Sequence, residues 1–344
     1  MLAVRVHEYG GPEVLRLEEV PDPAPRPDEV LVQVRACALN HLDLWNRSGR
    51  PRPSLQLPRI LGSDIAGVVQ AVGELVEHVR VGDEVIVSPG VSCGRCRWCL
   101  QGDDNMCPHY HIIGMGRDGG YAQLVTVPAV NVIPKPRGLN FAEAAALPLV
   151  FLTAWHMLKA RARLEPGETV LVWGAGSGVG SAAIQIAKLL GATVIAATGG
   201  SWKVQRAKAL GADAVIDYKS EDVLRQVRAL TSGRGVDVVF EHVGQVTWET
   251  SIKALRPGGR LVTCGNTTGW EARTDLRYIF ARQLTILGSY MGRKAELLEL
   301  LPWVESGRLR PVVHAVLPLE EATRAHEILE AGEQFGKVVL EPPA

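Results

Sequence analysis

The part of the sequence that most restricts the fold runs from Thr169 to Tyr290, where short apolar strands alternate with helical stretches. The predicted strands are TVLVWG, TVIAAT, AVIDY, VDVVFE, RLVTCG and LTILGSY. The first intervening helix is predicted roughly from Gly178 to Leu190 and the next from Ser201 to Leu210. Strands that are apolar throughout and alternate with helices form a parallel sheet covered on both faces. We therefore expect a doubly wound α/β domain in this region.

A glycine-rich turn, GAGSGVG, joins the first of these strands to the first helix. Its glycines remove side chains where a pyrophosphate must approach the backbone, and the helix N-terminus directs N–H groups toward it. No register satisfies the spacing G-x-G-x-x-G, so the prediction depends on the position of the turn at the first strand–helix junction. A turn that needs glycines only for packing is the alternative. The predicted cofactor-binding residues are Gly174, Gly176, Ser177, Gly178, Val179 and Gly180.

The segment after the second strand bears on which nucleotide binds. NAD-binding sheets usually carry an acidic residue about twenty positions beyond the glycine turn, where it binds the ribose hydroxyls. The segment from Gly191 to Ala212 contains no Asp or Glu, and it offers Thr198, Ser201, Lys203 and Arg206 instead. These neutral and basic side chains suit a 2′-phosphate, whereas ordinary surface cations at a helix start are the alternative. We expect NADP(H) as the cofactor, with NAD(H) as the second possibility.

Four of the six cysteines, Cys93, Cys96, Cys99 and Cys107, occur within one short loop. Cysteines two residues apart supply soft ligands at about 2.3 Å for a tetrahedral zinc ion. Four thiolates complete the coordination and leave no position for water or substrate, so the predicted zinc is structural, with one ion per chain. Chance clustering or a redox pair is the alternative.

The composition limits the class of protein. The chain is 47% hydrophobic and 22% charged, with 37 basic and 37 acidic residues, which is typical of a soluble globular protein. This balance leaves no electrostatic footprint for nucleic acid or an anionic membrane. No apolar run reaches the length of a membrane-spanning helix, and the first residues lack the layout of a signal peptide. We expect a cytoplasmic protein with a small-molecule substrate.

The length of 344 residues exceeds one ordinary core, so we expect more than one domain. Residues 1–150 contain short β-rich runs separated by Gly and Pro turns, which predict a β-rich domain with the cysteine lobe at about 91–110. Residues 151–288 form the predicted nucleotide-binding domain. Residues 289–344 contain a helix, a strand, a second helix and the closing GKVVL, and we expect this segment to return to the first domain.

From end to end the chain resembles the medium-chain dehydrogenase/reductase superfamily of zinc alcohol dehydrogenases and quinone oxidoreductases. The resemblance is carried by the C-x2-C-x2-C-x7-C lobe and by GDEVIVSPGVSCGRC, PGETVLVWGAGSGVGSAAIQIAKLLGATVIAA, GVDVVFEHVG and the closing GKVVL. It implies a GroES-like catalytic domain, a Rossmann domain, an active site in the cleft between them, and NAD(P)-dependent oxidoreductase activity. Members commonly assemble through the last strand of the sheet, here LTILGSY, so a homodimer or homotetramer is expected.

The chain departs from zinc alcohol dehydrogenases at all three positions that hold their catalytic zinc. Asn40 replaces the first cysteine ligand, Ser63 the histidine and Leu149 the later cysteine, while Asp64 replaces a neighbouring glutamate. Asn40 and Asp43 with the following RSG resemble the quinone oxidoreductase branch, which has no catalytic zinc. The resemblance therefore implies a quinone or enone reductase with a structural zinc and no catalytic zinc.

Two other functions remain open. A second metal site rebuilt from Cys37, His41, Asp43, Asp64 and His156 would make the chain a zinc-type alcohol dehydrogenase that interconverts alcohols and aldehydes or ketones. A non-catalytic protein that binds NADPH is the other alternative, because a fold does not guarantee turnover.

The predicted catalytic residues are Asn40, His41, Asp43 and Thr153. Without a metal, hydride addition to an enone or quinone is easier than alcohol chemistry, because a few oriented donors can hold a delocalised enolate. We expect Asn40 to orient the substrate carbonyl or the nicotinamide ribose, and His41 to donate or relay a proton while Asp43 fixes its geometry. Asp43 alternatively caps a turn or helix. Thr153 resembles the family threonine beside the nicotinamide and alternatively bonds its own helix backbone.

Overall fold

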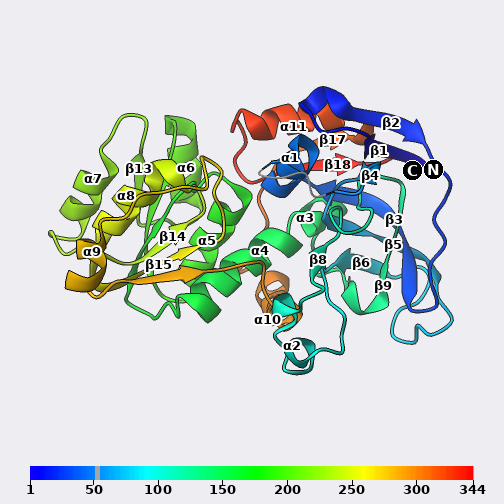
Figure 1. Ribbon diagram of the computed structural model, residues 1–344, viewed down its shortest axis with the longest axis horizontal. Helices are drawn as coiled ribbons and strands as arrows, with labels where there is room; N and C mark the ends of the chain where they lie inside the picture. The colour runs from blue at the N-terminus through cyan, green and yellow to red at the C-terminus, as the bar shows by residue number, and fades with distance from the viewer. Residues whose placement is uncertain (51–54, 344) are drawn as a thin grey trace. The chain divides into compact units, whose positions relative to one another are not determined.

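The computed structural model describes residues 1–50 and 55–343, which form two compact units (Figure 1). Unit 1 comprises Met1–Leu149 and Arg293–Ala344, and unit 2 comprises Val150–Gly292. The chain leaves the first unit once, folds the whole of the second and then returns. The sequence analysis places the two boundaries after residues 150 and 288, and the structure places them after residues 149 and 292.

Within the described residues, unit 2 contains one six-stranded sheet in the order β13-β12-β11-β14-β15-β16. All neighbouring strands are parallel, and Leu171 of β11 lies between Ile195 and Val239 of the adjacent strands. Leu171 and Val239 are fully buried, as expected for a sheet covered on both faces. This confirms the predicted doubly wound sheet. Its strands are β11 (Thr169–Val172), β12 (Thr193–Thr198), β13 (Ala214–Asp217), β14 (Val236–Glu241), β15 (Leu255–Thr263) and β16 (Thr285–Gly288).

Helices connect these strands and flank the sheet (Figure 1). The first two crossover helices begin at the residues that the sequence predicts and end one residue earlier. The helical elements are α4 (Pro148–Trp155) with the π-helical turn η4 (His156–Arg161), α5 (Gly178–Leu189), α6 (Ser201–Ala209), α7 (Val223–Leu230), α8 (Gln245–Ala254) and α9 (Leu276–Ala281).

Unit 1 is rich in β-structure, as the sequence predicts. In the part of the chain that the structure describes, its largest sheet has seven strands in the order β10-β6-β5-β3-β18-β17, with β9 also paired to β3. These strands are β3 (Glu29–Ala38), β5 (Asp64–Val72), β6 (Glu84–Val87), β9 (Leu124–Pro128), β10 (Val132–Pro134), β17 (Val313–Pro318) and β18 (Lys337–Glu341). A smaller sheet contains β1 (Leu2–Val6), β2 (Leu15–Glu19) and β4 (Arg59–Ile60), while β7 (Gly90–Val91) pairs with β8 (His111–Ile112).

Unit 1 also contains helices, most of which are short. They are η1 (Pro12–Val14), α1 (His41–Ser48), α2 (Arg97–Leu100), η2 (Asp104–Met106), η3 (Ala129–Asn131), α3 (Phe141–Ala145), α10 (Lys294–Glu305), η5 (Leu319–Glu321) and α11 (Ala322–Glu330). Across residues 1–50 and 55–343, no helix combines the length and the apolar character needed to cross a bilayer.

The end of the chain joins the centre of the unit 1 sheet. Strand β18 pairs antiparallel with β3, with Val339 opposite Ala38. On its other side β3 pairs with β5, where Ala38 lies opposite Asp64. Side chains at the neighbouring ends of β3, β5 and β18 are therefore brought together, although they come from both ends of the sequence.

Candidate functional site

The four cysteines of the lobe lie close enough to share one metal ion. Their Sγ atoms are all within 4.8 Å of one another. The Sγ atom of Cys99 is 4.0 Å from that of Cys93 and 3.5 Å from that of Cys96. A tetrahedral ion with sulfur bonds of about 2.3 Å needs sulfur–sulfur separations of roughly 3.8 Å, so the arrangement fits zinc. Four sulfurs fill the coordination shell and leave no position for a substrate.

Backbone hydrogen bonds shape this lobe and lower the pKa of one of its thiols. The backbone N–H groups of Cys93 and His109 each donate to the Sγ atom of Cys107 over 3.4 Å. The backbone N–H groups of Arg95 and Cys96 lower the pKa of Cys93 to about 6. The backbone N–H of Lys294 donates to Asp104 Oδ1 over 3.1 Å, which connects the lobe to the start of α10.

Among residues 1–50 and 55–343, the cysteine lobe is the one group of three or more His, Cys, Asp and Glu residues arranged to hold a metal. The set considered for a second site, Cys37, His41, Asp43, Asp64 and His156, does not form such a group. What the structure brings together near Asn40 is a cluster with a lysine in it.

Three buried side chains form this cluster. The Nζ atom of Lys337 donates to Asn40 Oδ1 over 2.5 Å and to Asp64 Oδ2 over 2.8 Å. The Nδ2 atom of Asn40 donates to the same Asp64 oxygen over 3.0 Å. The backbone N–H of Leu149 donates to the other carboxylate oxygen over 2.8 Å. Lys337, Asn40 and Asp64 are only 3%, 6% and 0% exposed.

Asp43 stabilises the start of α1, which is the alternative that the sequence left open for it. Its carboxylate accepts the backbone N–H of Asn40 over 2.7 Å and that of Gly62 over 3.1 Å. Burial raises the pKa of Asp43 to about 6, although both backbone donors oppose this shift. His41, the first residue of α1, is half-buried, and its ring lies edge-on to Trp45 at 5.6 Å.

A chain of hydrogen bonds extends from Asp43 toward the surface. The hydroxyl of Tyr121 bonds to Asp43 and lies 3.2 Å from Nε2 of His326, whose Nδ1 lies 3.1 Å from Arg47. A guanidinium can only donate, so Nδ1 of His326 accepts and Nε2 carries the proton. Burial and the charge of Arg47 lower the pKa of His326 to about 3, which keeps this ring neutral. Arg47 also pairs with Glu330, which is partly exposed.

In unit 2, the glycine turn leads directly into α5. Ser177 is the N-cap of this helix, and its Oγ accepts the N–H of Gly180 over 2.9 Å. A side chain at Gly174 would meet the His242 ring at 2.7 Å, and one at Gly180 would collide with the carbonyl of Gly174. Packing therefore requires both glycines. The remaining N–H groups of the first turn lack intrahelical acceptors, so the turn also fits a pyrophosphate.

The segment after β12 places Thr198 at the strand end and Ser201 and Lys203 in the first turn of α6. The Nζ atom of Lys203 lies 5.3 Å from the centre of the Trp202 ring. The sequence analysis found no acid in this segment, but Asp217 reaches it from β13 and accepts the N–H of Gly200 over 3.0 Å. Only the pairing of β12 with β13 reveals this carboxylate.

Across residues 1–50 and 55–343, two of the three buried hydroxyls without a partner belong to almost fully buried residues, and the third is that of Ser289. Within the described residues, neither Ser63 Oγ nor Thr153 Oγ1 has a hydrogen-bond partner. The hydroxyl of Thr153 therefore does not bond its own helix backbone, which was the alternative for this residue. A buried polar group without a partner costs about 1–3 kcal/mol, so such groups usually meet a bound ligand or water.

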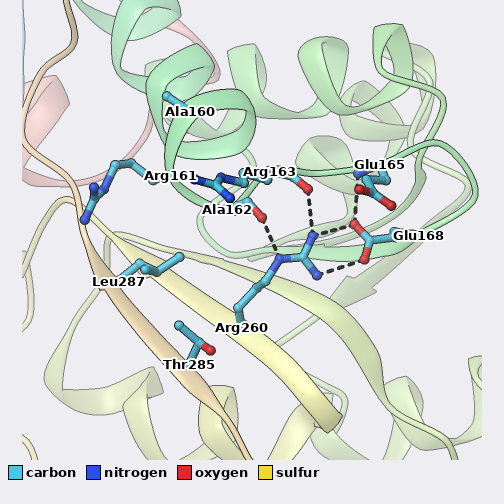
Figure 2. Close-up of a pocket in the computed structure, with 9 residues that line it drawn as sticks. All are labelled: Ala160, Arg161, Ala162, Arg163, Glu165, Glu168, Arg260, Thr285 and Leu287. Carbon is cyan, nitrogen blue, oxygen red and sulfur yellow. Dashed lines mark hydrogen bonds and ion pairs between the residues drawn. The ribbon is translucent and has the colours of Figure 1, made fainter.

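Unit 2 also contains a surface pocket with a volume of about 480 Å³ (Figure 2). Arg260 spans it and donates to Glu168 over 2.8 Å and to the carbonyl of Arg163 over 2.9 Å, so its charge is already paired. The pocket is lined by Ala160, Arg161, Ala162, Arg163, Glu165, Glu168, Arg260, Thr285 and Leu287. It contains none of the residues expected to bind cofactor, metal or substrate.

No motif in the sequence predicts a role for Lys337, Tyr121, His326 or Arg47. For Lys337 the available signal is its place directly before the apolar residues of the closing strand, in GKVVL. A lysine at such a place is noteworthy, because lysines are rarely buried. The other three have ordinary sequence surroundings, and only the packing of α11 and α1 against the rest of unit 1 reveals them.

Comparisons with known families agree with this architecture. Residues 26–137 match the family described as alcohol dehydrogenase GroES-like domain, and residues 178–306 match the family described as zinc-binding dehydrogenase. The chain belongs to the medium-chain dehydrogenase/reductase superfamily. It is an NAD(P)-dependent oxidoreductase with a GroES-like domain and a Rossmann domain.

Relatives in this superfamily include alcohol dehydrogenases and quinone oxidoreductases. The chain is 34% identical to an NAD-dependent alcohol dehydrogenase of Saccharolobus solfataricus, with 99% of this chain and 100% of the relative covered. It is 35% identical to a quinone oxidoreductase of Pseudomonas aeruginosa, with 97% of each chain covered. A crystal structure of an NAD-dependent alcohol dehydrogenase superposes with a TM-score of 0.96, at 51% identity and 99% coverage of both chains.

Proposed function

We propose that this oxidoreductase transfers hydride from a nicotinamide cofactor to a quinone or enone without a catalytic metal. The observation that carries the proposal is the hydrogen-bonded cluster of Asn40, Asp64 and Lys337. By the family resemblance, Asn40 and Asp64 stand where zinc alcohol dehydrogenases carry a metal ligand and a neighbouring acid. An amide and a carboxylate that are bonded to an ammonium make a poor donor set for zinc, which prefers sulfur and imidazole ligands. The lysine charge also repels a cation.

The other two positions at which the resemblance implies a zinc ligand also favour a site without a catalytic metal. Leu149 has no donor atom in its side chain, and the hydroxyl of Ser63 is a weak zinc ligand compared with imidazole. Outside residues 51–54 and 344, the metal-binding arrangement that forms is the cysteine lobe. Its four residues would hold one zinc ion, and this ion would stabilise the loop.

The chemistry we propose needs donors more than a Lewis acid. Hydride addition to the β-carbon of an enone produces an enolate, whose charge a few oriented donors can stabilise. One N–H of Asn40 is only weakly engaged, because Ala38 O lies 3.5 Å away, so it can donate to a substrate carbonyl. We assign the proton-donor role to His41, and Thr153 carries a buried hydroxyl with a free donor for a ligand.

For the nucleotide we propose NADP(H). Support comes from the absence of an acid between Gly191 and Ala212 and from Lys203 in the first turn of α6. The Asp217 carboxylate beside Gly200 would favour NAD(H) instead. However, it also accepts the N–H of Lys219 over 3.0 Å and so caps a turn. Thr198 and Ser201 supply neutral donors beside it.

We also propose that the protein forms a homodimer or homotetramer through the free edge of the unit 2 sheet. Strand β16 ends the sheet order, and its Ile286 is substantially exposed. The nearby helix α9 exposes Leu276 at 70% and Phe280 at 71%. An apolar edge strand pairs readily with a second copy across a two-fold axis. Light scattering at micromolar concentration that finds only monomer would contradict this assembly.

The deciding experiment is a steady-state assay of the native protein with quinones, enones, aldehydes and alcohols, each with NADPH and NADH. We expect the highest kcat/KM for quinones or enones with NADPH, and no loss of initial rate on brief chelation. Fast alcohol oxidation that disappears with a second, labile metal would identify a zinc-type alcohol dehydrogenase instead. An absence of turnover with every compound would favour a non-catalytic NADPH-binding protein.

A further inference from the structure

Backbone and side-chain contacts within unit 1 hold Lys337 in place. It is the first residue of β18, and its backbone N–H donates to Val312 O over 2.8 Å. The next residue, Val338, accepts the backbone N–H of Leu39 over 2.9 Å, which fixes β18 beside the end of β3. The side chain of Lys337 is 4% exposed and points to two acceptors. Its ammonium therefore has a defined position before any ligand binds.

The ammonium helps to hold Asn40 in one orientation. A lysine has three donors and no acceptor, so the amide atom that faces Nζ at 2.5 Å must be the carbonyl oxygen. The NH2 group of Asn40 then faces Asp64 Oδ2 at 3.0 Å. Asp64 Oδ2 and Ala38 O accept from this NH2 group and favour the same orientation, and the lysine adds the contact that holds the amide oxygen. Without the lysine, the amide would be held from its NH2 side alone.

The ammonium also compensates for a buried negative charge. Asp64 is completely buried, and Lys337 is its ion-pair partner across the described part of the chain. A second carboxylate, Asp43, is buried in the same region. Removing one partner from a buried ion pair leaves the other charge uncompensated, which is strongly unfavourable. A metal ion bound by anionic ligands would neutralise buried negative charge in the same way as the lysine.

We propose that Lys337 is a positioning residue that acts as an internal cation in place of a metal ion: it holds the amide oxygen of Asn40 and neutralises Asp64. This inference rests on the proposed function, because Asn40 matters for turnover only if it orients the substrate. It predicts a property that an ordinary structural ion pair lacks. A small alkylammonium ion should restore the site when the lysine side chain is shortened.

The experiment compares Lys337→Ala with Lys135→Ala in the full-length protein. Lys135 is a matched control, because it is also a mostly buried lysine of unit 1, and it donates to Leu139 O and pairs with Glu84. We expect Lys337→Ala to lose about 10²-fold in kcat on the best quinone or enone, as for the loss of one oriented donor. Millimolar ethylammonium should restore much of this loss saturably, whereas Lys135→Ala should show neither effect.

A second measurement separates this inference from the proposed function. Ethylammonium should raise the melting temperature of Lys337→Ala, but not that of Lys135→Ala, whether or not any substrate is reduced. A native protein without reductase activity contradicts the proposed function while this measurement still tests the internal cation. The absence of both rescue and thermal shift in a folded Lys337→Ala protein would overturn the inference.

A double variant covers the case in which Lys337→Ala does not fold. In Lys337→Met with Asp64→Asn both charges of the ion pair are removed, so neither partner is left as an uncompensated charge. We expect this variant to fold and retain its zinc, and to turn over about 10²-fold more slowly because Asn40 is no longer held. Wild-type turnover in the double variant would show that the lysine serves stability alone and would contradict the proposal. Failure of the neutral pair to fold would contradict it as well.

Discussion

Two regions of unit 1 gather electron-rich side chains. The regions differ in the source of the positive charge that balances these side chains. The cysteine lobe collects four sulfurs within 4.8 Å, and three of the four cysteines are partly exposed. The cluster around Lys337 collects an amide and a carboxylate that are almost fully buried. The lobe fits a cation taken from solution, whereas the cluster contains a cation of its own.

The difference follows from where the residues lie in the sequence. The cysteines occur within one loop, so their arrangement depends on a few turns and on a metal that can enter from the surface. The cluster unites Asn40, Asp64 and Lys337, which meet only after β3, β5 and β18 have paired. Metal loading should therefore control the stability of the lobe, and folding alone should complete the cluster.

Removal of one cysteine ligand should have the largest effect on stability. We expect Cys99→Ser to lose its zinc and to melt on the order of 10 °C lower, because a structural zinc contributes directly to folding free energy. Turnover per folded molecule should change little. Metal analysis and calorimetry check both points, with Cys264→Ser, outside the lobe, as the control. Two tightly held zinc ions per native chain would break the comparison between the regions.

Loss of Asn40 should affect turnover more than any other property. We expect Asn40→Ala to lower kcat on a quinone or enone by roughly ten- to a thousandfold, as for removal of one oriented donor. Affinity for NADPH should change much less, because the glycine turn carries that binding. Asn140→Ala is the matched control, since Asn140 only caps α3. An Asn40→Ala protein as fast as the native enzyme would contradict the proposed site.

Asp43 should make stability depend on pH in an unusual direction. Its pKa is raised from 3.8 to about 6, so between these two pH values the folded protein binds a proton that the unfolded chain does not. The contribution of Asp43 is therefore fully present near pH 4 and is lost as pH rises through 6. The shift of about two pH units corresponds to about 3 kcal/mol.

The Asp43→Asn variant should lack this contribution. Urea unfolding at pH 4.5 and pH 7 measures it as a difference in free energy of unfolding between variant and native protein. Asp28→Asn is the control, because Asp28 is exposed. An identical pH dependence in native and Asp43→Asn proteins would show that burial does not perturb this carboxylate.

The smallest effect is expected for Lys203, a cation that contrasts with Lys337 because it lies on a helix start in unit 2. We expect Lys203→Ala to weaken NADPH binding by about tenfold, as for loss of one charge-assisted hydrogen bond, and to leave NADH almost unchanged. Fluorescence titration with both nucleotides checks this, with Lys208→Ala of the same helix as the control. Tighter binding of NADH than of NADPH by the native protein would contradict the cofactor proposal.

The sequence by itself was sufficient for the parts of the protein that depend on short-range patterns. Strands β12 and β14 coincide with the predicted segments, because an apolar run between turn residues depends little on distant parts of the chain. Helix α5 begins within the glycine turn, at the predicted residue Gly178. The four cysteines were recognisable from their spacing, since ligands two residues apart meet at one ion without help from the rest of the fold.

Only the tertiary structure decided what occupies the region around Asn40. The sequence showed that zinc ligands are replaced there, but not that Lys337 supplies a charge from almost the opposite end of the chain. That contact depends on the register of three strands, and register is set by the packing of whole sheets. Asp217 beside Gly200 has the same origin, since it reaches the nucleotide segment from a neighbouring strand. Short-range patterns contain no information on such pairings, so these residues become visible only when the sheets are formed.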